Sequence, residues 1–272
     1  MNNNAPIGIF DSGVGGLTVA REIISLLPEE PIIYIGDDGR FPYGPRPKEE
    51  IQEFACQISD FLINQGVKMI VVACNTVSSQ ALDLLVSRYS VPVLGVIEDT
   101  ASYAAPLSRK KRVGVLATPG TVYSNAYPEA FSRIDPTIKV VQVASQALVN
   151  LIENGSGGEN GVKEFASRVI SPFRETGVDV LILGCTHYPY LTKLMTELLS
   201  DQAQIVDPAV AVSIRVRKEL LERKLSASGG NPERTFYTTG NPALFLKVGS
   251  QIYPGLKSVR ELKLEGNEKI RR

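Results

Sequence analysis

Short apolar runs recur along this 272-residue chain, and each is followed by a polar or glycine-rich turn and then by a helical pattern. The runs are continuous rather than alternating, which is typical of strands that are buried on both faces of a sheet. Strand–helix alternation of this kind predicts an α/β fold with parallel sheets. The expected strands are Ile7–Phe10, Ile32–Ile35, Met69–Ala73, Val93–Ile97, Val113–Ala117, Val140–Val143, Val180–Leu183, Ile205–Val206 and Phe236–Thr238.

Amphipathic stretches lie between these runs. Glu49–Gln65 carries apolar side chains at helical spacing, and Thr76–Tyr89, Leu191–Leu199 and Val210–Leu225 are expected to be helices as well. In folds of this class, ligands bind at the carboxyl ends of the strands. Functional residues are therefore expected directly after the strands.

The two halves of the chain show the same order of strand ends and cysteines. Cys74 follows Asp11 at nearly the same interval as Cys185 follows Thr118, and a further short strand comes after each cysteine. We interpret this pattern as one α/β unit present twice, which predicts two pseudo-symmetric lobes. The alternative is that any two α/β units look alike at this level of detail.

The length of the chain favours two domains. A boundary is expected near Glu98–Arg112, where a polar stretch precedes the first strand of the second unit. From about Ala209 onward the chain is expected to form a helix, a Gly/Ser loop and a strand. The residues of this segment alone leave open whether it extends the second lobe or returns to the first.

The charge balance argues against several classes of partner. Lysine and arginine together number 29, as do aspartate and glutamate, so the net charge is zero. We therefore expect no binding of nucleic acid and none of an anionic membrane. The first six residues lack the basic and apolar regions of a signal peptide, and no apolar run approaches the roughly 20 residues of a membrane span. These features predict a cytoplasmic protein.

Three cysteines are an odd number for a disulfide framework, so we expect reduced thiols. Cys74 and Cys185 each follow an expected strand and precede a polar turn and a helical pattern, a position that favours the thiolate and predicts a lowered pKa. Such a thiol can act as an acid or a base at neutral pH. Buried cysteines also serve as simple packing residues. We take packing as the role of Cys56, and catalysis as the role of the pair at equivalent places in the two units.

Two loops after the first strands are candidates for substrate contact. Asp11–Gly16 has glycines that suit a tight turn and a close approach of a ligand to the backbone. A dinucleotide site is disfavoured there, because Thr18 stands where glycine or alanine belongs and an acid would face the pyrophosphate. Asp37–Pro45 is long and distinctive, as active-site loops are, although a plain Pro/Gly-rich surface loop is the alternative.

His187 and Glu153 are two further titratable residues near the ends of expected elements. His187 lies two residues beyond Cys185, so the two side chains could form a nucleophile and its base. A lone histidine can also be structural, but this one follows a strand end. As the only histidine, it excludes a histidine-rich zinc site. Glu153 ends an amphipathic stretch, and by residue type alone it is a solvated acid.

Five segments taken together resemble the cofactor-independent aspartate/glutamate racemase family. Each segment alone is weakly specific, but their order and spacing match the family through nearly the whole chain. The Pro42–Tyr43–Gly44 loop favours the members that act on glutamate. The segments are Gly8–Gly16, Pro42–Tyr43–Gly44, Ala73–Cys74–Asn75–Thr76, Leu148–Val149 with Glu153–Asn154–Gly155, and Leu183–Pro189.

The resemblance implies that the chain interconverts L- and D-glutamate and supplies D-glutamate for bacterial peptidoglycan, with no pyridoxal phosphate, no metal and no other cofactor. It implies that Cys74 and Cys185 are the two bases, assisted by Asp11 and His187 respectively. Glu153 matches a family acid near the second cysteine. Substrate contacts would come from residues of both lobes, namely Asp11, Ser12, Tyr43, Gly44, Asn75, Thr76, Thr186 and His187.

The resemblance also implies an arrangement of lobes and subunits. It places the C-terminal segment back on the first lobe, so that residues 1–98 and 208–272 form one lobe and residues 99–207 the other. The active site would lie in the cleft between them, and the chain would form a homodimer.

Inversion of an α-carbon requires removal of a proton on one face and return of a proton on the other. Two thiols on facing lobes suit this task, one as thiolate and one as thiol, with their roles exchanged in the reverse direction. Asn75, Thr76 and Thr186 could hold the substrate carboxylates and the charge that develops on one of them. Three rivals stay open: a non-catalytic amino-acid-binding protein, a thiol hydrolase using Cys185 and His187, and a racemase of aspartate or a hydantoin.

Overall fold

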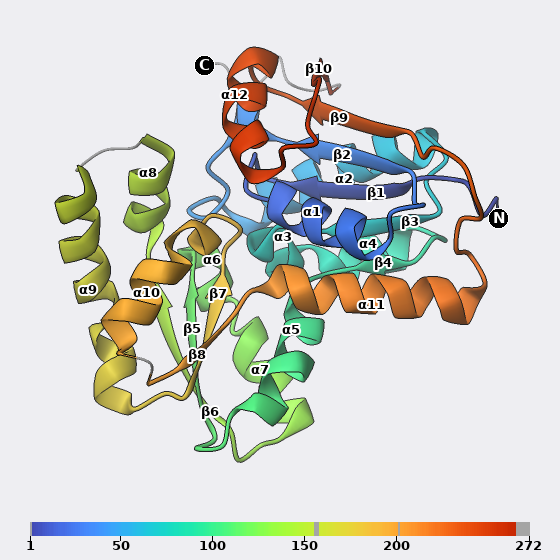
Figure 1. Cartoon of the computed structure of the whole chain (residues 1–272). Coiled ribbons are helices and arrows are strands. Elements are labelled where there is room, and N and C mark those ends of the chain that lie inside the picture. Colours follow the sequence, from blue (N-terminus) through green and yellow to red (C-terminus); the bar gives the residue numbers. More distant parts are fainter. Residues whose placement is uncertain (1, 155–157, 201, 265–272) are drawn as a thin grey trace.

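Two parallel sheets form the frame of the molecule, each with helices packed against it (Figure 1). The computed structural model describes residues 2–154, 158–200 and 202–264. The first sheet contains β1 (Ile7–Asp11), β2 (Ile32–Gly36), β3 (Met69–Val72), β4 (Val93–Leu94), β9 (Arg234–Thr238) and β10 (Arg260–Glu261). The second contains β5 (Arg112–Ala117), β6 (Lys139–Ala144), β7 (Val180–Gly184) and β8 (Gln204–Val206). The α/β fold with two parallel-sheet lobes is therefore confirmed.

The two sheets repeat one strand order. The first runs β10-β9-β2-β1-β3-β4 and the second β6-β5-β7-β8, so β2-β1-β3-β4 corresponds to β6-β5-β7-β8. Phe10 pairs with Val72 in the first sheet, and Leu116 pairs with Leu183 in the second. Counted from these pairs, the two catalytic candidates after β3 and β7 occupy the same position of the repeat.

The pairing register also corrects one detail of the predicted repeat. Asp11 corresponds to Ala117, and it is Ser12 that corresponds to Thr118. The sequence pattern matched Asp11 with Thr118 because both were taken as the first polar residue after a strand, while the backbone pairing shifts that match by one residue.

The strands are buried on both faces, as their continuous apolar sequences predict. All residues of β1, β2, β3 and β7 are buried. Alternate side chains enter different clusters: Ile7 and Ile9 belong to one hydrophobic core and Phe10 to another. This arrangement explains why the runs show no polar alternation.

The helices of the first lobe include one break that the sequence pattern did not predict. Those between β1 and β4 are α1 (Leu17–Leu26), α2 (Lys48–Asn64), α3 (Asn75–Gln80) and α4 (Leu82–Arg88). The single helix expected over Thr76–Tyr89 is divided at Ala81, whose φ of −126° leaves the helical region. Ser78 of α3 donates a hydrogen bond to the Val72 carbonyl and accepts one from Val96 N–H, which fixes this short helix against the ends of β3 and β4.

The second lobe contains α6 (Pro119–Tyr123), α7 (Ala126–Ile134), α8 (Gln146–Asn154), α9 (Gly158–Thr176) and α10 (Thr192–Leu199). Two segments connect the lobes. The chain passes from the first sheet to the second through α5 (Ile97–Ala104), which begins where a longer strand was expected, and returns through α11 (Pro208–Arg223). These two helices pack against each other, and α11 also packs along α1 (Figure 1).

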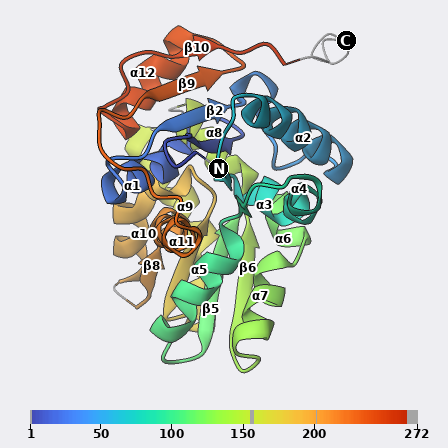
Figure 2. The same cartoon turned by 90° about the vertical axis from the view of Figure 1, so that its right-hand side faces the viewer.

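The C-terminal segment returns to the first sheet. β9 pairs in parallel with β2, and α12 (Pro242–Ile252) and β10 follow it on the same side of the molecule (Figure 2). Asn241 caps α12 by accepting hydrogen bonds from the amides of Ala243 and Leu244. The residues of this segment alone had left its lobe open, and the strand pairing places it.

A buried ion pair holds the chain that leaves α11 against the first sheet, at the amino-terminal ends of its strands. Lys68, directly before β3, lies 2.5 Å from Glu30, and the two side chains are 0% and 3% exposed. The Lys68 ammonium also donates to the Leu225 carbonyl, and Glu30 accepts from the Ala227 amide. The chain leaving α11 is thereby held against the first sheet.

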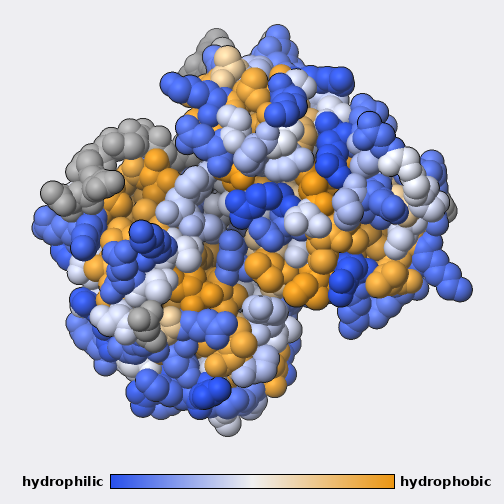
Figure 3. All heavy atoms as spheres, viewed as in Figure 1, coloured by the Kyte–Doolittle hydropathy of each residue, from blue (hydrophilic) through white to orange (hydrophobic). Residues whose placement is uncertain are grey.

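The surface mixes hydrophilic and hydrophobic side chains on the face drawn in Figure 3. Along α11, the apolar side chains of Val210, Ile214 and Leu221 are exposed. None of the helices within the described ranges is long and apolar enough to cross a membrane.

Candidate active site

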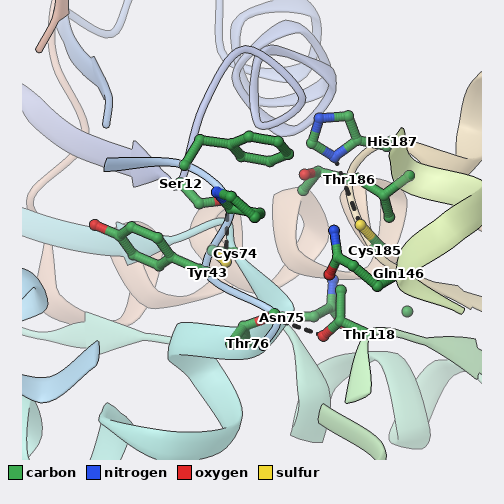
Figure 4. A pocket seen from close by; sticks show the side chains of 15 residues that line it. Ser12, Tyr43, Cys74, Asn75, Thr76, Thr118, Gln146, Cys185, Thr186 and His187 are labelled. Atoms are coloured by element: carbon green, nitrogen blue, oxygen red, sulfur yellow. Dashed lines mark hydrogen bonds between the residues drawn. The ribbon is translucent and has the colours of Figure 1, made fainter. Parts of the chain in front are cut away.

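A cavity lies between the two lobes, where the carboxyl ends of both sets of strands meet (Figure 4). Its empty volume is about 300 Å³, counted with the open space at its mouth. The segments that follow β1, β2 and β3 form one wall, and those that follow β5, β6 and β7 form the other. The lining residues are Ser12, Phe41, Pro42, Tyr43, Gly44, Cys74, Asn75, Thr76, Thr118, Gln146, Val149, Gly184, Cys185, Thr186 and His187.

The two cysteines lie on opposite sides of this cavity (Figure 4). Cys74 follows β3 directly before α3, and its Sγ lies 3.7 Å from Ser12 Oγ. Cys185 follows β7, and its Sγ lies 3.6 Å from His187 Nδ1. Both residues are almost fully buried, at 4% and 7% exposed. Two acid/base groups therefore face the same small space.

The expectation that Cys74 has a lowered pKa is wrong for this arrangement. Burial raises the pKa of the Cys74 thiol to about 12, and the negative charge of Asp11 adds to the rise. The helix that begins after Cys74 has only six residues, so the field at its N-terminus does not outweigh the loss of water. Cys185 is followed by a 3₁₀ turn over Tyr188–Leu191, so the argument from an α-helix N-terminus does not apply to it. At neutral pH, Cys74 is a thiol here and can donate a proton.

Asp11 lies behind the cavity wall rather than in it. Its carboxylate is fully buried and accepts hydrogen bonds from the amides of Gly13 (3.2 Å) and Gly16 (3.0 Å). Thr186 Oγ1, from the opposite lobe, lies 3.3 Å from the same carboxylate. Burial raises the pKa of Asp11, while His187 and these hydrogen bonds act to lower it. The carboxylate turns back into its own loop, and the contact of Asp11 with substrate stays a prediction.

The effect of the Asp11 charge on the pKa of the Cys74 thiol should be measurable. In a chain with Cys56 and Cys185 replaced by serine, Asp11→Asn removes a negative charge that raises the thiol pKa, so the Cys74 pKa should fall. The thiolate is the reactive form, so iodoacetamide should modify Cys74 faster at a fixed pH below that pKa. Asp38→Asn is the control, because Asp38 is a half-buried acid of the neighbouring loop and is not among the main groups that shift the pKa of this thiol. An alkylation rate that is unchanged or slower in Asp11→Asn would contradict the assignment.

A buried polar network holds the loop after β2. Asp37 accepts hydrogen bonds from Arg40 Nε (2.7 Å), from Thr239 Oγ1 (2.6 Å) and from the Tyr43 hydroxyl. The Arg40 guanidinium also lies 4.0 Å from the centre of the Phe54 ring. Tyr43 thus points its hydroxyl into the first lobe and away from the cavity (Figure 4). The residue still lines the cavity, and its contact with substrate stays a prediction.

Gly44 brings this loop against the second lobe. A Cβ at Gly44 would lie 2.2 Å from Gln146 Oε1 and 2.9 Å from Thr118 Cβ, so only glycine fits without displacement. The Gly44 carbonyl accepts a hydrogen bond from the Gly120 amide, at 3.0 Å. The loop therefore closes one side of the cavity.

Two threonine hydroxyl groups, one from each lobe, also contact each other at the cavity. Thr76 Oγ1 of the first lobe lies 2.9 Å from Thr118 Oγ1 of the second. Neither Thr118 nor Gln146 was among the predicted substrate contacts. Thr118 could have been found because it follows an expected strand of the repeat, as Asp11 does, whereas Gln146 carries no comparable signal in the sequence.

Two buried polar atoms at the cavity have no hydrogen-bond partner within the described part of the chain, namely Asn75 Nδ2 and Gln146 Oε1. Asn75 Oδ1 accepts from the Tyr127 hydroxyl, and Gln146 Nε2 donates to Asn150 Oδ1. Each amide thus leaves its other polar atom for a ligand. A donor and an acceptor in one small cavity suit a molecule that carries both carboxylate and ammonium groups.

The remaining predicted residues divide into two groups. Ser12, Thr186 and His187 line the cavity, and the ring of His187 lies 5.5 Å from that of Phe41. The backbone of Glu153 belongs to α8, but its side chain lies outside the described residues, so its role stays a prediction. Across the described ranges, no cluster of three or more His, Cys, Asp and Glu side chains is arranged to hold a metal ion.

Comparisons with known proteins agree on one family. The family model described as Asp/Glu/Hydantoin racemase matches residues 7–213. The glutamate racemase of Geobacter metallireducens is 41% identical, over 96% of this chain and 98% of its own length. A glutamate racemase isoform from Bacillus anthracis has a similar structure, with a TM-score of 0.94, 37% identity, and coverage of 97% of this chain and 99% of that one. The Francisella tularensis glutamate racemase in complex with D-glutamate has a TM-score of 0.90 and 38% identity, over 97% of this chain and 99% of that one.

Proposed function

The chain belongs to the Asp/Glu/Hydantoin racemase family, and we propose that it interconverts L-glutamate and D-glutamate by moving the Cα proton between Cys74 and Cys185. One observation carries the two-thiol mechanism: the cysteines occupy the same position of a repeated α/β unit and face one cavity from opposite sides. A substrate held between them presents one face of its α-carbon to each sulfur. The product D-glutamate would serve peptidoglycan synthesis.

In this proposal, binding uses the polar groups of both walls. Asn75 Nδ2 donates to a carboxylate, and Gln146 Oε1 accepts from the ammonium group. The hydroxyl groups of Thr76, Thr118 and Thr186 lie on the same cavity and offer further hydrogen bonds. The side chains that enclose the substrate also exclude water, which strengthens each of these contacts.

The chemical step transfers one proton off the α-carbon and another onto it. A thiolate on one side removes the proton, and the thiol on the other side supplies one to the opposite face, so the charge of the pair is unchanged and its protonation is reversed. His187, whose Nδ1 lies 3.6 Å from Cys185 Sγ, is placed to exchange a proton with that thiol. The raised pKa of Cys74 makes it the proton donor in the state described. Donors at the carboxylate stabilise the charge that develops there.

Incubation of the purified chain with L-glutamate in deuterated water tests the proposal. We expect the optical rotation to decay to zero, with deuterium at Cα of the D-glutamate formed, because the returned proton comes from a thiol that exchanges with solvent. Aspartate and a hydantoin should give no turnover under the same conditions. Turnover of one of these instead of glutamate would overturn the substrate assignment alone, and the absence of turnover with all three would overturn the proposed activity.

We further propose a homodimer located in the cytoplasm, which family membership supports. Light scattering on the purified chain should give about twice the mass of one chain, 29.6 kDa. A mass equal to one chain would overturn this assembly and leave the proposed chemistry intact.

A further inference from the structure

Tyr127 is a buried tyrosine that lies outside the cavity yet contacts one of its polar residues. It belongs to α7 of the second lobe and is 0% exposed. Its hydroxyl donates a hydrogen bond of 2.8 Å to Oδ1 of Asn75, the first residue of α3 in the first lobe. The bond therefore joins the two lobes at the edge of the candidate active site.

This hydrogen bond determines which end of the Asn75 amide faces a ligand. A primary amide has one acceptor and one donor end, and a turn of half a revolution exchanges them. The Tyr127 hydroxyl has one hydrogen, and by giving it to Oδ1 it leaves the NH₂ group for the cavity. Nδ2 is buried and has no partner among the described residues, so it is available to a carboxylate.

The opposite orientation would disfavour the substrate. It would turn Oδ1 toward the cavity, and a carbonyl oxygen repels a carboxylate because both are acceptors only. Burial raises the pKa of Tyr127, so the phenol keeps its hydrogen and remains a donor at neutral pH. The productive orientation of Asn75 thus depends on a hydroxyl from the other lobe.

We propose that Tyr127 is a positioning residue for the racemisation, acting through Asn75 by fixing its amide with the NH₂ group toward a substrate carboxylate. Because the two residues belong to different lobes, Asn75 is oriented only when the lobes are together as in this structure. Closure and the orientation of a substrate-binding amide are then one event. This inference rests on the proposed function.

Tyr127→Phe tests it, because the ring and its packing are kept and only the hydroxyl is lost. We expect KM for both enantiomers to rise by about 10-fold with little change in kcat, since a lost hydrogen bond of this kind weakens binding of the substrate and of the transition state alike. Tyr89→Phe is the matched control. It removes a tyrosine hydroxyl from bonds to the Cys56 carbonyl and Asp60, which do not line the cavity, and KM should not change.

A double-mutant cycle separates positioning from general packing. D-glutamate affinity is measured calorimetrically for the wild type, Tyr127→Phe, Asn75→Ala and the double variant, so the cycle needs no turnover. If Tyr127 acts through Asn75, its replacement should have no further effect once Asn75 is alanine. An equal loss of affinity in both backgrounds, or an unchanged KM in Tyr127→Phe, would overturn the inference while racemisation by the wild type still stands. A wild type without racemase activity would instead overturn the proposed function.

Discussion

Cys74→Ser and Cys185→Ser should each lower the rate of racemisation by about 10³-fold, because each substitution removes one of the two acid/base groups that face the substrate. Serine is nearly the same size as cysteine, so the cavity should keep its shape. Its hydroxyl is a far weaker acid than a thiol and ionises poorly near neutral pH. The rate is measured by polarimetry or circular dichroism, starting from each enantiomer in turn.

Cys56→Ser is the matched control for these variants. Cys56 lies in α2, is partly exposed and does not line the cavity, so this variant should racemise at nearly the wild-type rate. The pair of catalytic variants also distinguishes the mechanisms. A thiol hydrolase that uses Cys185 and His187 would survive Cys74→Ser, and a binding protein would keep its affinity in both. Near-full racemisation in either single variant would rule out the two-thiol mechanism.

Lys68→Met should lower the free energy of unfolding by about 3–5 kcal/mol, because it leaves the Glu30 carboxylate buried without its partner. The same change removes the hydrogen bond to the Leu225 carbonyl. Replacing both partners, in Lys68→Met/Glu30→Gln, should cost less than the single change, since no buried charge is then left unpaired. Urea unfolding followed by circular dichroism measures each difference.

Lys218→Met provides the comparison for this prediction. Lys218 pairs with Glu222 at 3.8 Å on α11, and the side chains are 63% and 57% exposed. Such a surface pair contributes only about 0.5 kcal/mol. A loss below about 1 kcal/mol for Lys68→Met would mean that the buried pair contributes no more than an exposed one, contrary to the expectation for buried ion pairs.

Much of the fold could be predicted because its strands are buried on both faces. Continuous runs such as Ile7–Phe10 and Val180–Leu183 lie within one residue of the strands found. The strand expected over Val93–Ile97 is only Val93–Leu94, because α5 begins at Ile97, and β10 was not predicted. Short edge strands carry too few residues for a pattern. The division into lobes of residues 1–98 with 208–272 and 99–207 stays a prediction.

The residue types of the candidate site could be predicted from the sequence, but the orientation of its side chains and the pKa of Cys74 could not. The cysteines were expected from their places after strands, Asn75 and Thr186 from the family resemblance, and all four line the cavity. The inward turn of the Asp11 carboxylate depends on amides of its own loop, and the raised pKa of Cys74 depends on burial by both lobes. No local pattern contains that information. Tyr127 was missed for the same reason, because its partner lies 52 residues away in the sequence.

The pairing register that relates the two sheets also shows where they differ. Asp11 corresponds to Ala117, and by the same count Thr76 corresponds to His187, so a carboxylate stands behind one thiol and an imidazole beside the other. The mirror-image forms of an amino acid have equal free energies in water, so the ratio kcat/KM must be the same from either side. Because the two sides of the cavity carry different side chains, kcat and KM can each differ between the two enantiomers. The enantiomer with the lower KM must then also have the lower kcat, in strict proportion.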